Sequence, residues 1–473
     1  MSKFLFEDFD EVSAKQWKQK VQYDLKGADY NDTLVWKSPE GINVKPFYHE
    51  DDFKEDFQPI PGQPQNWKIA QEIFIDDEKI ANNIAIDALH RGAESIILSA
   101  EGEFEIETVF KDFPFEQASI YLNLKFLSEA FYNKLIKFFS EKKATVYYNI
   151  DLIGNLARTG NWYHNLKQDH EILDSILKKN ASENLLSVNV ALYQNAGANI
   201  VQQLAYALAH ANEYLNHVCH PELVEGHQQQ DQSDVPSSTV ERSLITFHLA
   251  TGANYFFEIA KIRALRKLYA TLAKEYGANQ TCHILATPSK RNKTLYDYNV
   301  NLLRSTTECM SAILGGADAV CNLPYDALYR KSNEFGERIS RNQLLILKYE
   351  SYFDTVSNPA DGTYYIESLT EELAERALKL FKEIEKGGGF LQQLKEGTIQ
   401  KKIKESAEKE QQLFDSGALK LLGTNYHPNK NDRMKDDLEL FPFVKHNPVK
   451  TLIAPIVERR IAEKAEQERI SNE

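Results

Sequence analysis

Short apolar runs of β character alternate with longer stretches of helical periodicity along most of the chain. Eight such runs occur, at residues 69–75, 95–100, 119–124, 145–150, 185–190, 244–250, 281–286 and 318–323. The clearest helical patterns between them cover residues 79–92, 199–217, 255–276 and 300–314. Short apolar strands that alternate with helices predict parallel strand pairing through right-handed crossovers.

Eight βα units in succession favour a closed (β/α)8 barrel of the α/β class, which we expect to span residues 67–390. Its length of about 320 residues is somewhat above the ~250 residues of a typical barrel of this kind. An open, doubly wound sheet is the alternative, because short apolar runs do not by themselves distinguish the two.

Residues 1–66, before the first run, are predicted to form an extended N-terminal arm. Residues 13–26 fit an amphipathic helix in which Trp17, Val21 and Leu25 recur every fourth residue and form one apolar stripe. Apolar and aromatic surface on a thin arm needs something to pack against. We therefore expect the arm to contact either the rest of this chain or a partner.

An insertion at residues 219–240 is rich in Gln, Ser, Asp and Pro, and it interrupts the βα rhythm. Such a composition buries too little apolar surface to offset the entropy lost on ordering, so we predict a flexible loop. The loop should lie on the barrel face opposite the usual catalytic mouth. Its Cys219, His220 and His227 could together hold a metal ion, but a loop without metal is the favoured interpretation.

Residues 391–473 are rich in Lys, Glu and Gln, and they are predicted to be a helical C-terminal segment with a loop near residues 423–431. Residues 457–473 are expected to form a charged tail. No further βα rhythm follows the barrel, so we expect no second α/β domain in this chain.

The net charge of −14, from 55 basic and 69 acidic residues, argues against nucleic acid or an anionic membrane as a partner. No apolar run approaches the roughly 20 residues that span a bilayer, and the acidic N-terminus lacks a signal-peptide core. The chain has 4 cysteines and no Cys-x-x-Cys pair, which favours a reducing, cytoplasmic setting.

Common catalytic motifs are absent from the sequence. We find no dinucleotide or phosphate-binding glycine loop, no Gly-x-Ser-x-Gly and no His-Glu-x-x-His. Asp151 ends the fourth predicted strand, where it could be catalytic or could cap the next helix, and the sequence does not decide between these roles. His248 and His283 lie on predicted strands and are expected to be core or surface residues, not ligands.

Several segments, in the same order and spacing, resemble the methylmalonyl-CoA mutase family. Residues 36–48 carry Trp36-x-x-Pro39-Glu40-Gly41-Ile42, and residues 194–198 read Gln-Asn-Ala-Gly-Ala where the family has Gln-Glu-Ala-Gly-Ala. Further matches are residues 256–264, 301–317, 341–342 and 358–365. The resemblance implies a barrel that holds acyl-CoA along its axis, a C-terminal domain that supplies cobalamin, and the radical interconversion of methylmalonyl-CoA and succinyl-CoA.

The departures from the family are equally specific. The Tyr-His pair that contacts substrate in active members falls on Ala191 and Leu192, whose side chains can neither donate a hydrogen bond nor move a proton. Residues 61–64 run directly into the first predicted strand, where active members carry a segment that threads CoA. None of the 12 histidines fits the cobalt-ligating pattern Asp-x-His-x-x-Gly.

This combination resembles the small, non-catalytic subunit of a heterodimeric mutase. We therefore expect no catalytic, cofactor-binding or metal-binding residue in this chain, with Ala191 and Leu192 at the positions of the lost pair. Adenosylcobalamin would be bound by the large subunit, which would be the partner. The alternatives are the barrel of a split mutase completed by a separate cobalamin-binding protein, and a stand-alone CoA-binding or structural module.

Overall fold

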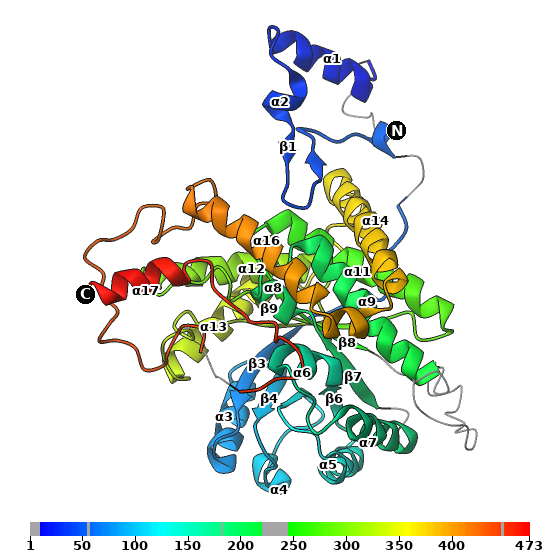
Figure 1. Ribbon diagram of the computed structural model, residues 1–473, viewed down its shortest axis with the longest axis vertical. Coiled ribbons are helices and arrows are strands. Elements are labelled where there is room, and N and C mark those ends of the chain that lie inside the picture. Colours follow the sequence, from blue (N-terminus) through cyan, green and yellow to red (C-terminus); the bar gives the residue numbers. More distant parts are fainter. Residues whose placement is uncertain (1–9, 54–56, 181–182, 220–244, 446–448) are drawn as a thin grey trace, which may run out of the picture.

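A closed barrel of eight parallel strands forms the centre of the protein (Figure 1). The computed structural model describes residues 10–53, 57–180, 183–219, 245–445 and 449–473. The strands are β3 (Lys68–Phe74), β4 (Ser95–Ala100), β5 (Ser119–Leu124), β6 (Thr145–Ile150), β7 (Asn184–Asn189), β8 (Thr246–Thr251), β9 (His283–Pro288) and β10 (Ala319–Cys321). They pair in chain order, and β10 closes the ring by pairing with both β9 and β3.

The predicted (β/α)8 fold is thus confirmed, because the first and last strands pair and an open sheet is excluded. Each of the eight predicted apolar runs corresponds to one barrel strand. Helices cover the barrel: α3 (Glu78–His90), α4 (Ile106–Val109), α5 (Glu129–Glu141), α6 (Leu152–Thr159), α7 (Leu166–Lys179), α8 (Ala191–Asn195), α9 (Ile200–Cys219), α11 (Tyr255–Glu275), α12 (Val300–Gly315), α13 (Glu334–Leu345) and α14 (Tyr364–Lys386).

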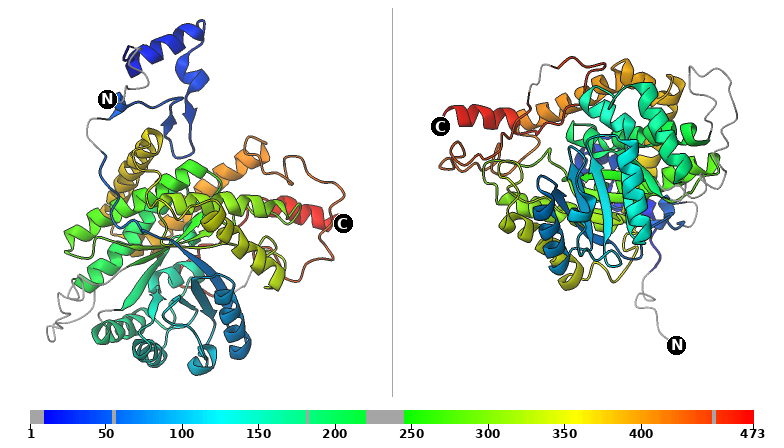
Figure 2. Two further views of the ribbon diagram at one scale, coloured as in Figure 1. Left: turned by 180° about the vertical axis from the view of Figure 1, so that it is seen from behind. Right: turned by 90° about the horizontal axis from the view of Figure 1, so that it is seen from below.

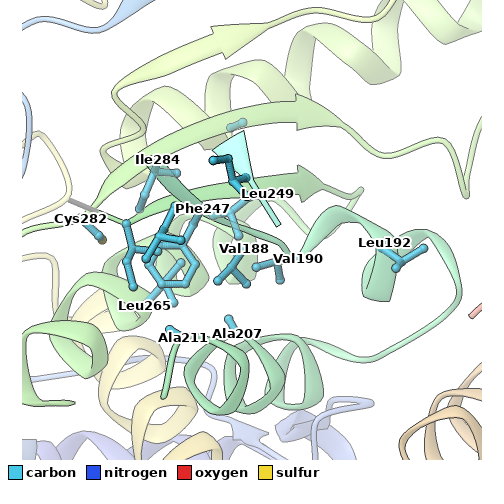
Figure 3. Packing of buried hydrophobic residues seen from close by; sticks show 14 of the residues in the cluster. Val188, Val190, Leu192, Ala207, Ala211, Phe247, Leu249, Leu265, Cys282 and Ile284 are labelled. Atoms are coloured by element: carbon cyan, nitrogen blue, oxygen red, sulfur yellow. The ribbon is translucent and has the colours of Figure 1, made fainter. Parts of the chain in front are cut away.

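Side chains on the strands alternate between the helices outside and the lumen inside, since successive residues of a strand point to opposite faces. The outward side chains are mainly Ile, Leu, Val and Phe. Val188 of β7, Phe247 of β8 and Ile284 of β9 belong to one buried cluster with Ala207 of α9 and Leu265 of α11 (Figure 3). This sheet-to-helix layer is the main hydrophobic core.

The N-terminal arm contains α1 (Ala14–Asp24), α2 (Tyr30–Leu34) and a hairpin of β1 (Trp36–Lys37) and β2 (Asn43–Val44). Ser13 and Gln16 form a capping box at the start of α1. The tip of the hairpin packs into the body, where Ile42 is 0% exposed and joins the main core. By contrast α1 buries no residue, and it stands away from the barrel in Figures 1 and 2.

The C-terminal segment is helical only in parts. It begins with α15 (Phe390–Lys395) and α16 (Thr398–Asp415) and ends with α17 (Glu463–Ser471), whereas residues 416–462 have almost no regular structure where described. Residues 457–473, expected to be a charged tail, are packed onto the body. Arg460 and Glu466 form a buried ion pair there, which offsets the cost of burying both charges.

The insertion predicted at residues 219–240 falls almost entirely outside the described residues, as do His220 and His227. Only Cys219 lies at its edge, as the last residue of α9, and its side chain is not described. The proposed loop and its metal-binding alternative therefore stay predictions.

One buried arginine holds the amino-terminal ends of the last two barrel strands together. Arg266 of α11 is 1% exposed and donates to Cys282 O at 2.8 Å, to Gly316 O at 2.7 Å and to Asp318 Oδ2 at 2.6 Å. Cys282 and Asp318 directly precede β9 and β10. The planar guanidinium is suited to serving several acceptors at once, which a lysine ammonium cannot reproduce in the same geometry.

We predict that Arg266→Ala lowers the free energy of unfolding by about 3–5 kcal/mol, because it leaves Asp318 and two carbonyl groups without their donor. The neighbouring Lys267 is a matched control, since it is 41% exposed and pairs with Glu371 at the surface. Lys267→Ala should change stability by less than about 1 kcal/mol. Urea denaturation followed by circular dichroism measures both changes, and similar values for the two variants would contradict the role given to Arg266.

Candidate functional site

The short helix α8 lies at the carboxyl end of β7, on the face where (β/α)8 enzymes carry their catalytic residues. It begins with Ala191 and Leu192. Ala191 is half-buried, and Leu192 is 2% exposed and part of the main hydrophobic cluster (Figure 3). The start of α8 therefore offers only hydrocarbon side chains toward any ligand.

A buried charged network holds α8 against β8 and α11. Lys261 of α11 donates to Ala250 O at 2.7 Å and to Gln203 Oε1 at 3.1 Å, and it pairs with Glu258. Lys261 Nζ also lies 3.3 Å from Gln194 Oε1. The segments at residues 194–205 and 256–264, far apart in the chain, thus meet in one structural unit that includes the end of α8.

Asp151 caps α6, and its carboxylate is largely buried beside His210. Its Oδ1 accepts from Gly154 N at 2.7 Å, which caps α6, and from Tyr214 Oη at 2.7 Å. His210 Nε2 lies 3.0 Å from the same oxygen, and His210 Nδ1 is 2.8 Å from Tyr193 Oη. Burial alone would raise the pKa of Asp151, but His210 and the hydrogen bonds hold it below its ordinary value.

Three rings from inward-facing strand positions lie across the barrel lumen. Tyr121 of β5 stacks on Tyr147 of β6 at 4.7 Å between ring centroids, and Tyr147 stacks on His283 of β9 at 4.0 Å. Tyr121 Oη lies 2.8 Å from His283 Nε2. Because β5 and β9 are four strands apart in a ring of eight, this hydrogen bond spans the barrel axis.

Other lumen-facing positions carry polar side chains. Lys68 Nζ donates to Ser119 Oγ at 2.7 Å near the amino-terminal end, and Ser99 Oγ donates to Glu72 Oε1 at 2.8 Å near the mouth. Buried polar atoms of Ser95, Asn149, Thr246 and His248 have no protein partner. A barrel core of this kind is usually filled by branched apolar residues, so the lumen is unusually polar.

Both lumen histidines are poor bases. Burial lowers the pKa of His248 and of His283 to about 4, because the charged imidazolium is costly in this desolvated space. Each is therefore neutral at pH 7, and a neutral imidazole can accept the hydrogen of the Tyr121 hydroxyl. Burial also raises the pKa of Tyr121 and of Tyr147, so neither phenol ionises at neutral pH.

The family model for methylmalonyl-CoA mutase matches residues 98–468, which is most of the chain. The chain belongs to the methylmalonyl-CoA mutase family. The small subunit of the Porphyromonas gingivalis enzyme is 34% identical over 469 residues, with 92% of this chain and 73% of that relative covered.

Two further relatives show how far the similarity extends. The methylmalonyl-CoA mutase of Rhizobium meliloti is 26% identical, with 91% of this chain and 66% of the relative covered. The small subunit of Propionibacterium freudenreichii subsp. shermanii is also 26% identical, with 81% of this chain and 63% of the relative covered. This chain thus spans somewhat less than two thirds of the length of these two mutase-family proteins.

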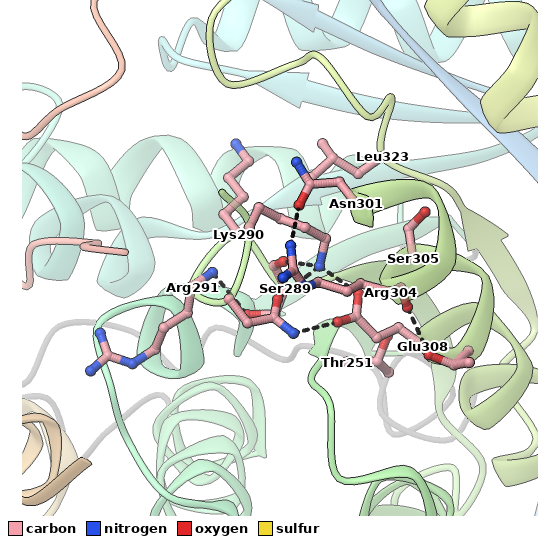
Figure 4. Close-up of polar contacts among 12 residues, drawn as sticks. Thr251, Ser289, Lys290, Arg291, Asn301, Arg304, Ser305, Glu308 and Leu323 are labelled. Carbon is pink, nitrogen blue, oxygen red and sulfur yellow. Dashed lines mark hydrogen bonds and ion pairs between the residues drawn. The ribbon is translucent and has the colours of Figure 1, made fainter. Parts of the chain in front are cut away.

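Another segment that resembles the methylmalonyl-CoA mutase family supports the loop after β9. Glu308 of α12 accepts from Lys293 Nζ at 2.6 Å and from Asn292 Nδ2 at 2.7 Å (Figure 4). Arg304 of the same helix donates to Asn301 Oδ1 at 2.8 Å and to Leu422 O at 2.7 Å. These side chains satisfy one another's hydrogen bonds, so they hold the loop after β9 in place.

Within the described residues, one group of three potential metal ligands comes together, at His49, Glu50 and Asp51 on the arm surface. It consists of adjacent exposed or half-buried residues, and His49 Nδ1 already accepts from Asp51 N. The described part of the chain contains no helix with the length and apolar character needed to cross a membrane.

Sequence reasoning placed His283 on a strand but missed the two tyrosines that stack with it. Tyr121 and Tyr147 each occupy the third position of a predicted strand, at matching register in neighbouring strands. Strand alternation would have directed them to the same face as Ala70, which lies in the lumen cluster. Two features of the sequence could therefore have placed both tyrosines in the lumen: the alternation of side chains along each strand and the prediction of a closed barrel.

The low pKa of His283 predicts a pH dependence of stability. In the unfolded chain its pKa returns to about 6.5, so between pH 4 and 6.5 the unfolded state binds one more proton than the folded state. The contribution of His283 to the free energy of unfolding is therefore fully present above pH 6.5, and it is lost as the pH falls toward 4. Its contribution to the slope is about 1.4 kcal/mol per pH unit.

His283→Gln cannot be protonated but can still accept a hydrogen bond from Tyr121. We expect the slope of unfolding free energy against pH to be flatter in this variant than in the wild type between pH 4.5 and 6. Urea titrations at a series of pH values give both slopes. Identical slopes would mean that His283 is protonated equally in the folded and unfolded states.

Proposed function

We propose that this chain is the non-catalytic small subunit of a heterodimeric methylmalonyl-CoA mutase. In this proposal a large subunit binds adenosylcobalamin and interconverts methylmalonyl-CoA and succinyl-CoA, and the present chain supports it structurally. The names of three similar proteins, each described as a methylmalonyl-CoA mutase small subunit, support the assignment. A cytoplasmic setting is also proposed, supported by the described cysteines, Cys282, Cys309 and Cys321, which are free and buried.

The observation that carries the non-catalytic assignment is the Tyr121–His283 hydrogen bond across the barrel axis. An acyl-CoA held along the axis would need a continuous path through the lumen. The stacked rings of Tyr121, Tyr147 and His283 lie in that path, and all three are nearly or fully buried. A chain of CoA dimensions could pass only if this stack opened.

The α8 positions support the same conclusion by a separate route. A thioester carbonyl bound near Ala191 and Leu192 would receive no hydrogen bond from either side chain, so neither residue could polarise it. A fold can persist while its catalytic site changes, because the residues that pack the core and the residues at the barrel mouth are different sets.

The histidines that line the described barrel lumen do not fit the role of cobalt ligand for adenosylcobalamin. A cobalt-ligating histidine must present a free ring nitrogen on an accessible surface, whereas His283 is committed to Tyr121 and His248 lies desolvated in the lumen. None of the 12 histidines follows an aspartate by two residues. We therefore propose that the large subunit binds the cofactor.

We predict that the isolated chain, supplied with adenosylcobalamin and methylmalonyl-CoA, shows no turnover. Calorimetry should give a Kd for methylmalonyl-CoA of about 1 mM or weaker. Removing two rings of the stack, by Tyr121→Ala with Tyr147→Ala, should strengthen acyl-CoA binding, because it opens the axis. The mutase activity of the double variant should remain zero.

Tyr148→Ala is the matched control for ring removal, since Tyr148 lies on the same strand as Tyr147 but faces the helices outside the barrel. It should leave acyl-CoA binding unchanged. Micromolar binding or turnover by the wild-type chain would contradict the non-catalytic assignment. Turnover that appears only with a separate cobalamin-binding protein would favour the split-enzyme alternative.

The arm is the proposed contact with the large subunit. Helix α1 buries none of its residues, and its Trp17 and Tyr23 are 49% and 81% exposed. Trp17 contacts only the edge of another arm residue, Phe47, among the aromatic contacts described. Exposed aromatic residues on a projecting helix are typical anchors of a protein interface.

We predict that Trp17→Ala with Tyr23→Ala weakens association with the large subunit by roughly 30-fold or more, as expected for aromatic residues at the centre of an interface. Tyr352→Ala is the control, since Tyr352 is 71% exposed on the barrel body. Co-expression followed by size-exclusion chromatography and titration calorimetry measures the effect. Unchanged affinity in the arm variant would place the interface elsewhere.

A further inference from the structure

Residues 451–461, here called the strap, run across the carboxyl-terminal side of the barrel. At one end the strap follows α6: Leu452 N and Ile453 N both donate to Gly160 O, at 3.0 and 3.2 Å. Ile456 N then donates to Ala157 O at 2.7 Å. The strap is therefore bound to the helix that follows β6 by main-chain hydrogen bonds.

Farther along, the strap passes over α8 and the loop after β9. Arg459 N donates to Asn195 O at 3.0 Å, and Ile461 N donates to Arg291 O at 2.9 Å. The side chain of Arg291 in turn donates a hydrogen bond from Nη1 to Arg459 O at 2.8 Å. The strap thus connects the ends of β6, β7 and β9, and Figure 1 shows it in red passing α6 toward α17.

A side-chain hydrogen bond joins the strap to α8. Asn195 Nδ2 donates to Glu458 Oε1 at 2.8 Å, while Asn195 Oδ1 accepts from Ser289 Oγ and from Lys290 N, each at 3.0 Å. Asn195 therefore uses both ends of its amide, with the oxygen facing the β9 loop and the nitrogen facing the strap. A carboxylate at this position would keep the contacts to the β9 loop but repel Glu458.

The strap is anchored near its C-terminal end by the buried ion pair between its own Arg460 and Glu466 of α17. Glu466 Oε1 also accepts from Leu295 N at 2.8 Å, and Glu473 accepts from Tyr296 Oη at 2.6 Å. Both Leu295 and Tyr296 belong to the loop after β9. These contacts fix α17 to the barrel, so the strap is held at both ends.

Its course also depends on a glycine at the end of α6. Gly160 adopts φ +80°, a region that favours glycine. A Cβ there would lie 2.6 Å from Ile453 O and 2.7 Å from Thr451 Cβ. The close approach of the two backbones is therefore possible only because position 160 has no side chain.

We propose that the strap is a built-in cover over the α8 side of the barrel mouth, latched by the Asn195–Glu458 hydrogen bond. Any domain or protein that reaches α8 from outside must first displace it. The mouth is thus closed on this side by the chain itself, whatever the reaction of the assembled enzyme. The inference does not depend on the proposed function, because its contacts are all within this chain.

Amide hydrogen exchange on the full chain tests the proposal. In the wild type, the amides of residues 453, 456, 459 and 461 should be protected, since each donates into the body. Asn195→Asp should speed their exchange by roughly 10- to 100-fold, the effect of losing a hydrogen bond to a charged group. Exchange in α8 should rise together with that in the strap.

Exchanging the donor and the acceptor distinguishes loss of the Asn195–Glu458 hydrogen bond from general destabilisation of the protein. In the double variant Asn195→Asp with Glu458→Gln, the new amide on the strap can donate to the new carboxylate on α8, so protection of the strap should return. Asn165→Asp is the charge-matched control, because Asp also serves well as the cap of α7, and it should leave strap exchange unchanged.

Three results would overturn the proposal: rapid exchange of the strap in the wild type, unchanged exchange in Asn195→Asp, and a strap that opens without exposing α8. Failure of the swap to restore protection would also count against the latch. None of these results bears on the mutase assay or on binding to a large subunit, so a failure here is distinguishable from failure of the proposed function.

Discussion

Closure of the parallel ladder, by pairing of β10 with both β3 and β9, is the constraint on which the rest of the structure depends. Once the ring is closed, every strand residue faces either the helices or a lumen, and no strand edge remains to be covered. The outward positions supply the apolar core shared with α9 and α11. The inward positions become a separate environment whose content decides what the barrel can hold.

That inner environment is polar and crossed by aromatic rings. The hydrogen bond from Tyr121 to His283 joins opposite sides of the ring, and Tyr147 stacks between them. Desolvation keeps both lumen histidines neutral, so the lumen contains few charges away from its two ends. The stacked rings and the hydrogen bond between Tyr121 and His283 thus join opposite strands of the barrel to one another.

At the mouth, a buried ion pair supports a short apolar helix. The Lys261–Glu258 pair and Gln194 lie together where α8 meets β8 and α11, while α8 begins with Ala191 and Leu192. The two charges depend on each other, because an unpaired buried charge is costly. The strap then covers the same helix from outside.

The sequence by itself determined the eight strands and the helices between them, because apolar runs and helical periodicity are local properties that do not depend on distant contacts. Tertiary structure decided that the strands close into a barrel and do not form an open sheet, because closure requires β10 to pair with β3. The apolar run at residues 185–190 also placed Ala191 and Leu192 directly after a strand, as the structure has them. That these two residues stand at the positions of the family's Tyr-His pair stays a prediction. The sequence left the role of Asp151 open and described residues 457–473 only as a charged tail. Tertiary structure showed that Asp151 caps α6 beside His210 and that Arg460 pairs with Glu466, contacts that exist only in the folded chain. The Tyr121–His283 bond joins residues 162 positions apart, and Asn195–Glu458 joins residues 263 apart. Contacts over such separations are set by ring closure and by the path of the returning chain, and no local pattern encodes them.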